Sequence, residues 1–257
     1  MDFVQILGLI LCRISAFIVL APLFSERGFP RMAKLIVAVC LTVAAFPEVT
    51  TSYRAVSGGL YLLLALKESL FGMVMGYISK LVFDAVTMSG VFIDFQTGLT
   101  MAQAYDPTFQ VQNSTYGKIY NWMAIMVFFA LNLHLLMIKG VMYSFEMIPL
   151  GTANILTGSV IEGIVKLFVK AFAMAISLAA PLVVAVLVVD VVLGVIARTI
   201  PQINVLLLGM SIKTIVALIL FLLALPNVVD FLQANLPAAY TNIVDLVKAL
   251  KGRWVSE

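Results

Sequence analysis

Long apolar runs occupy most of this chain, and they restrict its fold more than any motif does. Seven of them lie near residues 3–23, 33–47, 58–79, 81–104, 122–149, 161–192 and 203–225. A helix needs about 20 apolar residues to cross the hydrocarbon core of a bilayer. The chain is 63% hydrophobic and 11% charged, with a mean hydropathy of +1.11, far from the composition of soluble domains. The sequence predicts an all-α, polytopic membrane protein whose number of crossings is not fixed by hydropathy.

Charge and reactive side chains exclude several classes of function. The net charge of +3 is spread along the chain, which argues against nucleic acid as a partner. Cys12 and Cys40 are isolated within apolar runs, and the single histidine, His134, has no companion ligands. We therefore expect no metal and no cofactor, and a hydrogen-bonded structural role for His134. The sequence has no HExxH, GxSxG or P-loop pattern, so we predict that it is not an enzyme.

The first apolar run contains a charge, Arg13, and no basic region precedes it. This run is therefore predicted to be a retained helix and not a cleaved signal. An arginine at the centre of a membrane helix costs about 3 kcal/mol on insertion scales. An ion pair within the chain or between subunits is the favoured role of Arg13, and direct contact with a transported substrate is the alternative. The connector after this run holds Arg27, Arg31 and Lys34, which favours a cytoplasmic loop.

Small and charged residues recur at every fourth position from the third run into the fourth. They are Glu68, Gly72, Gly76, Lys80 and Asp84. Steps of four place residues on successive turns of one helix face. Gly72 and Gly76 form a small-xxx-small pair, which lets two helix backbones approach closely. We expect packing to be the main role of these glycines, with Glu68 in a tight helix interface.

Two later sets of residues repeat the spacing of four. They are Gly90, Asp94, Gly98 and Ala102, and then Asp190, Gly194 and Arg198. A turn with Pro201 and Gln202 follows the last set and predicts a helical hairpin. Its returning helix, near residues 203–225, carries Lys213 and is expected to end at Pro226, before a separate amphipathic helix.

These residues form a hypothesis about helix contacts. A charge within a membrane segment needs a partner in protein or water, so we expect the charged members to pair within the chain or between subunits. The proposed contact residues are Arg13, Glu68, Gly72, Gly76, Asp94, Gly98, Asp190, Arg198, Gln202 and Lys213.

A polar stretch interrupts the apolar runs between Gly90 and Asn121. From residue 96 to 121 its only charges are Asp106 and Lys118, and amides, hydroxyls and glycines fill much of the rest. Asp106 precedes a proline, which disfavours helical backbone there. Irregular backbone at membrane depth is tolerated only where protein or a water-filled cavity satisfies it. The stretch is therefore predicted to form a passage wall or a constriction.

Four motifs, in order, are similar to those of a known family. They are APLFSERGFPRMAK (21–34, with Arg13 before it), KESLFGMVMG (67–76), GVFIDFQTGLTMAQAYDP (90–107) and ARTIPQINVLLLGMSIK (197–213). Over nearly its whole length the chain resembles the FliR/SctT family, subunits of the export gate of bacterial flagella and related type III secretion systems.

The resemblance implies partners, a location and a division of the chain. FliP-like and FliQ-like subunits, and an FlhB-like subunit, would surround a conduit for unfolded export substrates in the bacterial inner membrane, within the flagellar basal body. Residues 1–257 would form one export-gate domain, FliP-like to about 180 and a FliQ-like hairpin over 181–257. A loop near 105–120 would plug the closed channel. The plug and lining residues would be Met101, Gln103, Tyr105, Asp106, Pro107, Thr108, Phe109, Gln110, Gln112 and Asn113.

The segment 132–151, NLHLLMIKGVMYSFEMIPLG, is similar to the histidine-containing segment of flagellar members. It favours the flagellar branch over the injectisome branch, which is the alternative. The chain departs from the family in two places. It has Asn132-Leu133-His134-Leu135 where many members have a glycine and a second histidine, and Ser211 where a proline is frequent before the lysine. An independent secondary transporter is the rival class, since such proteins also use broken helices and buried carboxylates.

Overall fold

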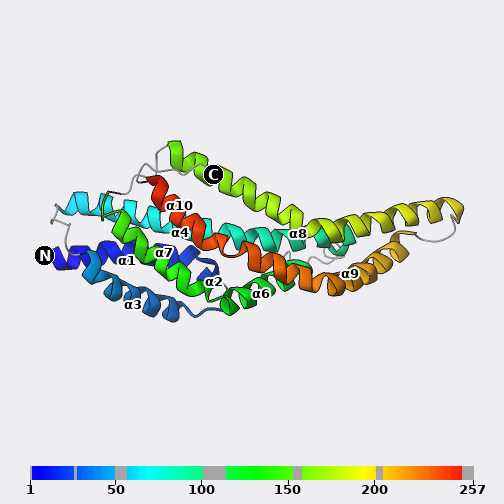
Figure 1. The fold of residues 1–257 in the computed structure, drawn as a ribbon, viewed down its shortest axis with the longest axis horizontal. Coiled ribbons are helices and arrows are strands. Elements are labelled where there is room, and N and C mark those ends of the chain that lie inside the picture. The colour runs from blue at the N-terminus through cyan, green and yellow to red at the C-terminus, as the bar shows by residue number, and fades with distance from the viewer. Residues whose placement is uncertain are drawn as a thin grey trace. The chain divides into compact units, whose positions relative to one another are not determined.

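The computed structural model describes residues 2–25, 28–49, 57–100, 114–152, 158–200 and 205–250. Within these ranges all regular structure is helical (Figure 1), so the predicted all-α class is confirmed. The helices are α1 (Asp2–Leu20), α2 (Pro22–Ser25), α3 (Arg31–Val49), α4 (Gly58–Thr97), α6 (Thr115–Ala130), α7 (Leu133–Met147), α8 (Gly158–Thr199), α9 (Val205–Asn235) and α10 (Ala238–Leu250).

Four helical stretches in the described part of the chain are long and apolar enough to cross a bilayer. They are Phe3–Leu20, Gly58–Thr97, Val160–Thr199 and Gly209–Lys248. The helices α6 and α7 give a fifth if they are taken together as one broken span. These helices confirm the prediction of a multi-pass membrane protein, because each provides the roughly 20 apolar residues that a crossing needs.

Two predicted helix boundaries differ from the structure near the middle of the chain. The runs 58–79 and 81–104 are not separated at Lys80: residues on both sides of it belong to α4, which ends at Thr97, because a single lysine is a good helix former and does not end the helix. The run 122–149 is instead divided into α6 and α7. The division falls at Asn132, whose φ of 55° is left-handed, a region that asparagine tolerates better than most residues.

One helix end predicted at a proline differs from the structure. The helix α9 continues through Pro226 to Asn235, so its predicted end at Pro226 is wrong. Pro181 likewise lies inside α8. In membrane helices, neighbouring groups re-satisfy the backbone carbonyls that proline leaves unpaired. The break comes later, at Pro237, where the amide of Ala239 donates to the carbonyl of Leu236 at 3.0 Å.

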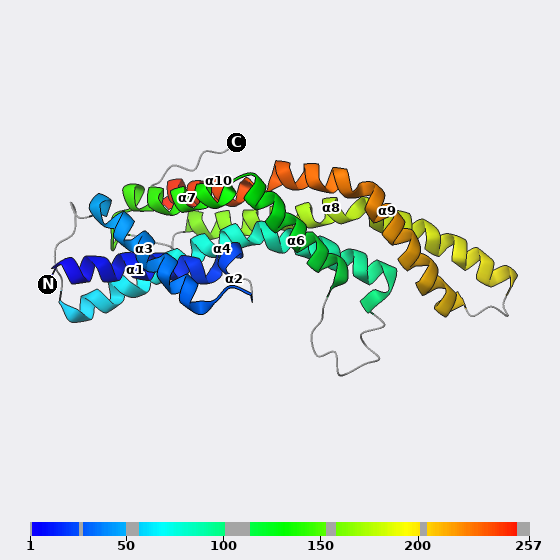
Figure 2. The same cartoon turned by 90° about the horizontal axis from the view of Figure 1, so that it is seen from below.

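The chain forms two compact units. Unit 1 comprises Met1–Val82, Phe129–Val169 and Leu236–Glu257. Within it α1 packs against α2 and α3, α3 packs against α7, and α7 packs against α10 (Figure 2). Fully buried apolar side chains fill its core, among them Leu9, Ile10, Ile14, Phe71, Met75 and Ile78.

Unit 2 comprises Phe83–Phe128 and Lys170–Asn235. Here α8 and α9 lie on either side of residues 201–204 as the two arms of a hairpin, yellow and orange in Figure 1. Phe83 packs edge-to-face on Phe128, with ring centroids 5.3 Å apart. Many large apolar side chains of the two arms are exposed, including Val184, Leu187, Val188, Val191, Leu222 and Leu223. Such faces suit lipid or other protein better than water.

The predicted division into a FliP-like part up to about residue 180 and a FliQ-like hairpin over 181–257 does not follow the boundaries of these two units. That division stays a prediction.

Candidate functional site: polar contacts between apolar helices

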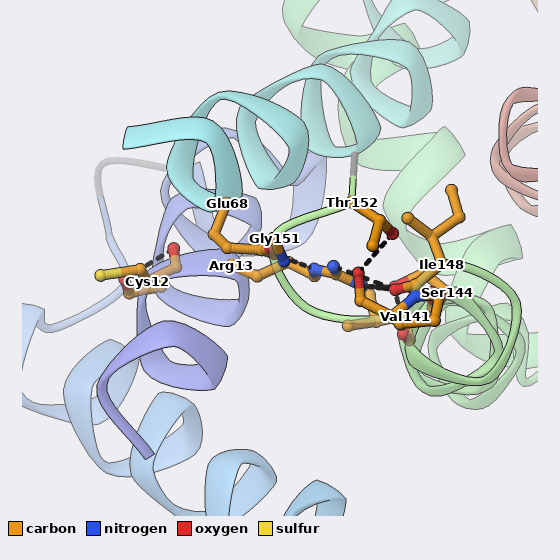
Figure 3. A network of polar contacts seen from close by, with 10 residues as sticks. Cys12, Arg13, Glu68, Val141, Ser144, Ile148, Gly151 and Thr152 are labelled. Atoms are coloured by element: carbon orange, nitrogen blue, oxygen red, sulfur yellow. Dashed lines mark hydrogen bonds and ion pairs between the residues drawn. The ribbon is translucent and has the colours of Figure 1, made fainter. Parts of the chain in front are cut away.

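Arg13 and Glu68 form an ion pair inside unit 1. The Nε of Arg13 on α1 donates to Oε2 of Glu68 on α4 at 2.6 Å, and both side chains are 0% exposed. Figure 3 shows the guanidinium extending from α1, past Glu68, toward the end of α7. The structure thus brings together two of the predicted contact residues, although 55 positions separate them.

The other nitrogens of Arg13 contact the C-terminal end of α7. Nη1 donates to the carbonyl of Ser144 at 3.1 Å, and Nη1 and Nη2 donate to the carbonyl of Ile148 at 3.3 and 3.2 Å. The rings of Phe71 and Phe145 lie 4.8 and 4.4 Å from the guanidinium carbon. The carbonyl of Ser144 also accepts from the amide of Ile148 at 3.0 Å, so Arg13 adds a second donor there. The carbonyl of Ile148 lies beyond the last turn of α7, where the helix supplies no donor, and Arg13 satisfies it while remaining buried.

Glu68 uses its second oxygen to hold the turn that follows α7. The amide of Gly151 donates to Oε1 of Glu68 at 2.7 Å. Gly151 has a φ of +80°, a conformation that residues with a Cβ rarely adopt. One carboxylate therefore links α1, α4 and this turn. Leaving either charge of such a pair buried without its partner costs about 3–5 kcal/mol, so the contact fixes the arrangement of unit 1.

Gly72 and Gly76 lie against the backbone of α1. A Cβ on Gly72 would stand 2.1 Å from the carbonyl oxygen of Arg13, and a Cβ on Gly76 would stand 2.7 Å from that of Phe17. No side chain fits at such distances without a shift of the backbone. The two glycines therefore permit the close approach that brings Arg13 to Glu68.

In unit 2, Asp94 lies near the end of α4 and is fully buried. Its carboxylate accepts a hydrogen bond from the hydroxyl of Ser114 and a second from the amide of Tyr116, at 3.4 Å. Gly98 follows the last turn of α4 with a φ of +83°. Asp94 therefore contacts the first residues of α6.

Asp190 and Lys213 pair across the two arms of the α8–α9 hairpin. The amide nitrogen of Gln96 on α4 donates to the other oxygen of Asp190 at 3.0 Å. The side chains of Lys213 and Asp190 are 21% and 33% exposed. This contact joins α4, α8 and α9 within unit 2.

The remaining predicted positions are not part of these contacts. Arg198 is exposed on the last turn of α8, and none of the described residues forms an ion pair with it. Gly194 has open space around it. Gln202 lies outside the described residues, as do all the predicted plug and lining positions, which are Met101, Gln103, Tyr105, Asp106, Pro107, Thr108, Phe109, Gln110, Gln112 and Asn113.

A comparison with known proteins identifies the family. The model of bacterial export proteins, family 1, matches residues 4–238. The chain belongs to this family.

Curated relatives of this export protein cover most of its length. The flagellar biosynthetic protein FliR of Bacillus subtilis (strain 168) is 34% identical over 219 residues, which are 84% of the chain and 85% of the relative. The FliR protein of Aquifex aeolicus (strain VF5) is 30% identical over 226 residues, 88% and 87% of the two chains. That of Escherichia coli (strain K12) is 27% identical over 240 residues, 93% and 92%. The family predicted from the four motifs is confirmed.

The polar groups of this export protein hold helices together. Within the described ranges, no three His, Cys, Asp or Glu side chains lie close enough to bind a metal ion. His134 packs on the ring of Phe129, with centroids 5.2 Å apart. Its Nδ1 is buried without a hydrogen-bond partner in the described part of the chain. This nitrogen thus lacks the hydrogen bond expected of His134.

Several contact residues were not selected from the sequence. Ser144, Gly151 and Ser114 bind the selected charges. A serine or a glycine in an apolar sequence gives no signal of its own for such a role. The pairing of Asp190 with Lys213 did have one, because Asp190 comes 11 positions before residue 201 and Lys213 comes 9 positions after residue 204, so the two arms of the predicted hairpin bring them to similar heights.

Proposed function

We propose that this chain is a core subunit of the flagellar protein export gate in the bacterial inner membrane, within the basal body. The observation that carries the proposal is the family match over residues 4–238. Curated relatives named flagellar biosynthetic protein FliR, which cover 84–93% of the chain in the three comparisons above, support the flagellar role.

The partners in this proposal are FliP-like and FliQ-like subunits, with an FlhB-like subunit beside them. Residues up to about 180 would play a FliP-like part, and residues 181–257 would form a FliQ-like hairpin. The exposed apolar side chains on α8 and α9 support such an assembly, because faces of this kind need lipid or protein to cover them. The buried pair of Arg13 and Glu68 would keep the subunit rigid within it.

The proposed substrates are unfolded flagellar proteins that thread through the conduit. Of the predicted plug loop near 105–120, residues 115–120 form the start of α6, so that end of the prediction is wrong. In the proposal the polar segment 101–113 obstructs the conduit at rest and supplies its lining. This part of the proposal rests on the polar, nearly uncharged sequence of the segment. A lining without strong binding sites contacts many sequences and releases each of them readily. The subunit itself performs no chemical reaction, so the energy for transport comes from other components.

Co-expression tests the proposal directly. The chain is produced with the FliP-like and FliQ-like proteins of its own organism, and the complex is purified in detergent through a tag on one partner. We expect all three to purify together. A chain that purifies alone as a monomer, and that moves a small solute when reconstituted into vesicles, would instead be a secondary transporter.

A deletion tests the plug. Removing residues 103–112 should raise the uptake of a small impermeant dye across the inner membrane without loss of the assembled complex. Replacing the same residues with a glycine–serine linker of equal length separates the bulk of the segment from its sequence. Unchanged uptake in an assembled deletion variant contradicts the plug. Restoration of motility in a strain lacking its own FliR protein distinguishes the flagellar branch from the injectisome branch.

A further inference from the structure

The buried carboxylate of Asp94 lies between the end of α4 and the start of α6. Asp94 is 0% exposed and precedes the end of α4 by three residues. One of its oxygens accepts from the hydroxyl of Ser114, and the other accepts from the amide of Tyr116. Ser114 and Tyr116 flank the first residue of α6. A carboxylate beside the first amides of a helix is also favoured by the helix dipole.

Ser114 connects Asp94 to the first turn of α6 through a second hydrogen bond. Its Oγ donates to Asp94 and accepts a hydrogen bond from the amide of Gly117 at 2.8 Å. Serine is a preferred N-cap residue because its oxygen satisfies an amide of the first turn. Asp94, Ser114 and Gly117 therefore form a continuous hydrogen-bonded relay from α4 into α6, which we call the Asp94 relay.

The end of α4 is set within the same turn. The hydroxyl of Thr97 donates to the carbonyl of Asp94 at 3.1 Å, and the amide of Gly98 donates to the carbonyl of Phe95 at 3.2 Å. The positive φ of Gly98 then takes the backbone out of the helix. The chain leaves α4 four residues after Asp94, and it returns at Ser114 to the carboxylate of Asp94.

Close backbone contact accompanies the relay. A Cβ on Gly90 would stand 2.2 Å from the amide nitrogen of Gly117, so α4 and α6 touch one turn before Asp94. On another face of α6, Tyr116 and Tyr120 pack on Phe221 of α9, with ring centroids 5.4 and 5.7 Å apart. The start of α6 is thus held by packing, and the relay adds the directional contact that fixes its first residue.

We propose that Asp94 is the positioning residue for the ends of the polar segment 101–113, because its carboxylate holds the first turn of α6 against the last turn of α4. The inference rests on the proposed function, in which this segment obstructs the conduit. Asp94 is buried and acts through Ser114 and the first turn of α6. It does not contact the exported chain.

Point variants of the assembled complex test this role. D94A and S114A each remove one member of the relay, and D94N keeps its size but weakens its acceptor. The matched control is S89A, because Ser89 is a buried serine of α4 whose hydroxyl donates to the carbonyl of Val86, within its own helix. We expect D94A and S114A to give a several-fold rise in dye uptake, D94N a smaller rise, and S89A none.

An exchange of the two partners separates positioning from general stability. The double variant D94S/S114D places a hydroxyl on α4 and a carboxylate at the start of α6, where a carboxylate also caps a helix well. We expect its dye uptake to fall back toward that of the unchanged protein, below that of D94S alone. A merely space-filling role would give additive defects in the double variant.

The variants and the deletion together distinguish failure of the Asp94 role from failure of the plug. If the 103–112 deletion raises uptake and assembled D94A and S114A do not, the role of Asp94 is refuted while the plug stands. If the deletion itself has no effect, the proposed function of the segment fails. If D94A does not assemble, S114A decides: increased uptake through an assembled complex supports the inference. Loss of assembly in S114A, with S89A intact, refutes it in favour of a purely structural role.

Discussion

The two units of this export protein use charged side chains in contrasting ways. In unit 1 the side chains of Arg13 and Glu68 are 0% exposed, and the guanidinium has carbonyl and carboxylate acceptors around it. In unit 2 the paired side chains of Asp190 and Lys213 remain 33% and 21% exposed. The first contact allows one arrangement of its helices. The second keeps access to its surroundings, so it tolerates the loss of a partner better.

The largest expected effect comes from breaking the buried pair. E68L leaves the guanidinium of Arg13 without a carboxylate and removes the acceptor of the Gly151 amide. Loss of one partner from a buried pair costs about 3–5 kcal/mol. We expect E68L to abolish recovery of the complex in detergent, measured by tag purification and size-exclusion chromatography.

A double variant is the control for that experiment. R13M/E68L removes both charges and replaces them with apolar side chains, which is often tolerated where a single loss is not. We expect it to recover part of the complex that E68L loses. Equal losses in the single and double variants would show that the contact depends on shape and not on charge.

A methyl group on the α1–α4 interface should have the next largest effect. G72A places a Cβ 2.1 Å from the backbone oxygen of Arg13, and overpacking of this kind costs about 1–3 kcal/mol. We expect a lower thermal midpoint of the complex in detergent. G59A on α4 and G194A in unit 2 are the controls, since nothing lies within 4 Å of either Cβ. A midpoint that G72A leaves unchanged would contradict the close packing of unit 1.

Breaking the partly exposed pair of Asp190 and Lys213 in unit 2 should change the thermal midpoint less. K213M removes the partner of Asp190 but leaves Gln96 as a donor to it. Because Gln96 still donates to Asp190 and the pair is only partly buried, we expect a smaller fall in the thermal midpoint than E68L gives, with normal assembly. The exchange D190K/K213D should restore the midpoint. A loss as large as that of E68L would remove the contrast between the two units.

The smallest effect should come from substituting Lys166, which pairs with Glu162 one helical turn earlier on α8. Their side chains are 69% and 66% exposed. Exposed pairs spaced by four residues contribute little to stability, so K166A should leave the thermal midpoint within error. A clear fall would indicate that a neighbouring subunit covers this end of α8.

The sequence determined the class of the fold and the residues in need of partners, but few of the partners. The apolar runs predict membrane helices, and Arg13 within such a run requires an acceptor. Its pairing with Glu68 could not be read from the sequence, because helix periodicity says which residues share a face and not which faces meet. The same limit applies to Asp94 and Ser114, which lie on different helices.

Helix boundaries were predictable only where local chemistry decided them. The continuation of α9 through Pro226 depends on its surroundings in the fold, which the local rule for proline does not include. The break at Asn132 was missed because an asparagine between leucines resembles an ordinary polar residue of a helix. Charge partners on different helices were equally hard to predict: Asp190 pairs with Lys213 on the opposite arm of the hairpin, and not with Arg198 on its own helix.

The C-terminal helix completes unit 1, and this has a consequence for biosynthesis. The hydroxyl of Ser79 on α4 donates to the carbonyl of Ala239 on α10, and Gly140 of α7 lies against Tyr240 and Ile243. A ribosome makes these α10 residues after α1, α3, α4 and α7. The earlier helices therefore remain in the membrane without their α10 contacts until α10 has been translated. A premature stop codon before Ala238 would leave the surfaces of α4 and α7 that contact α10 permanently uncovered.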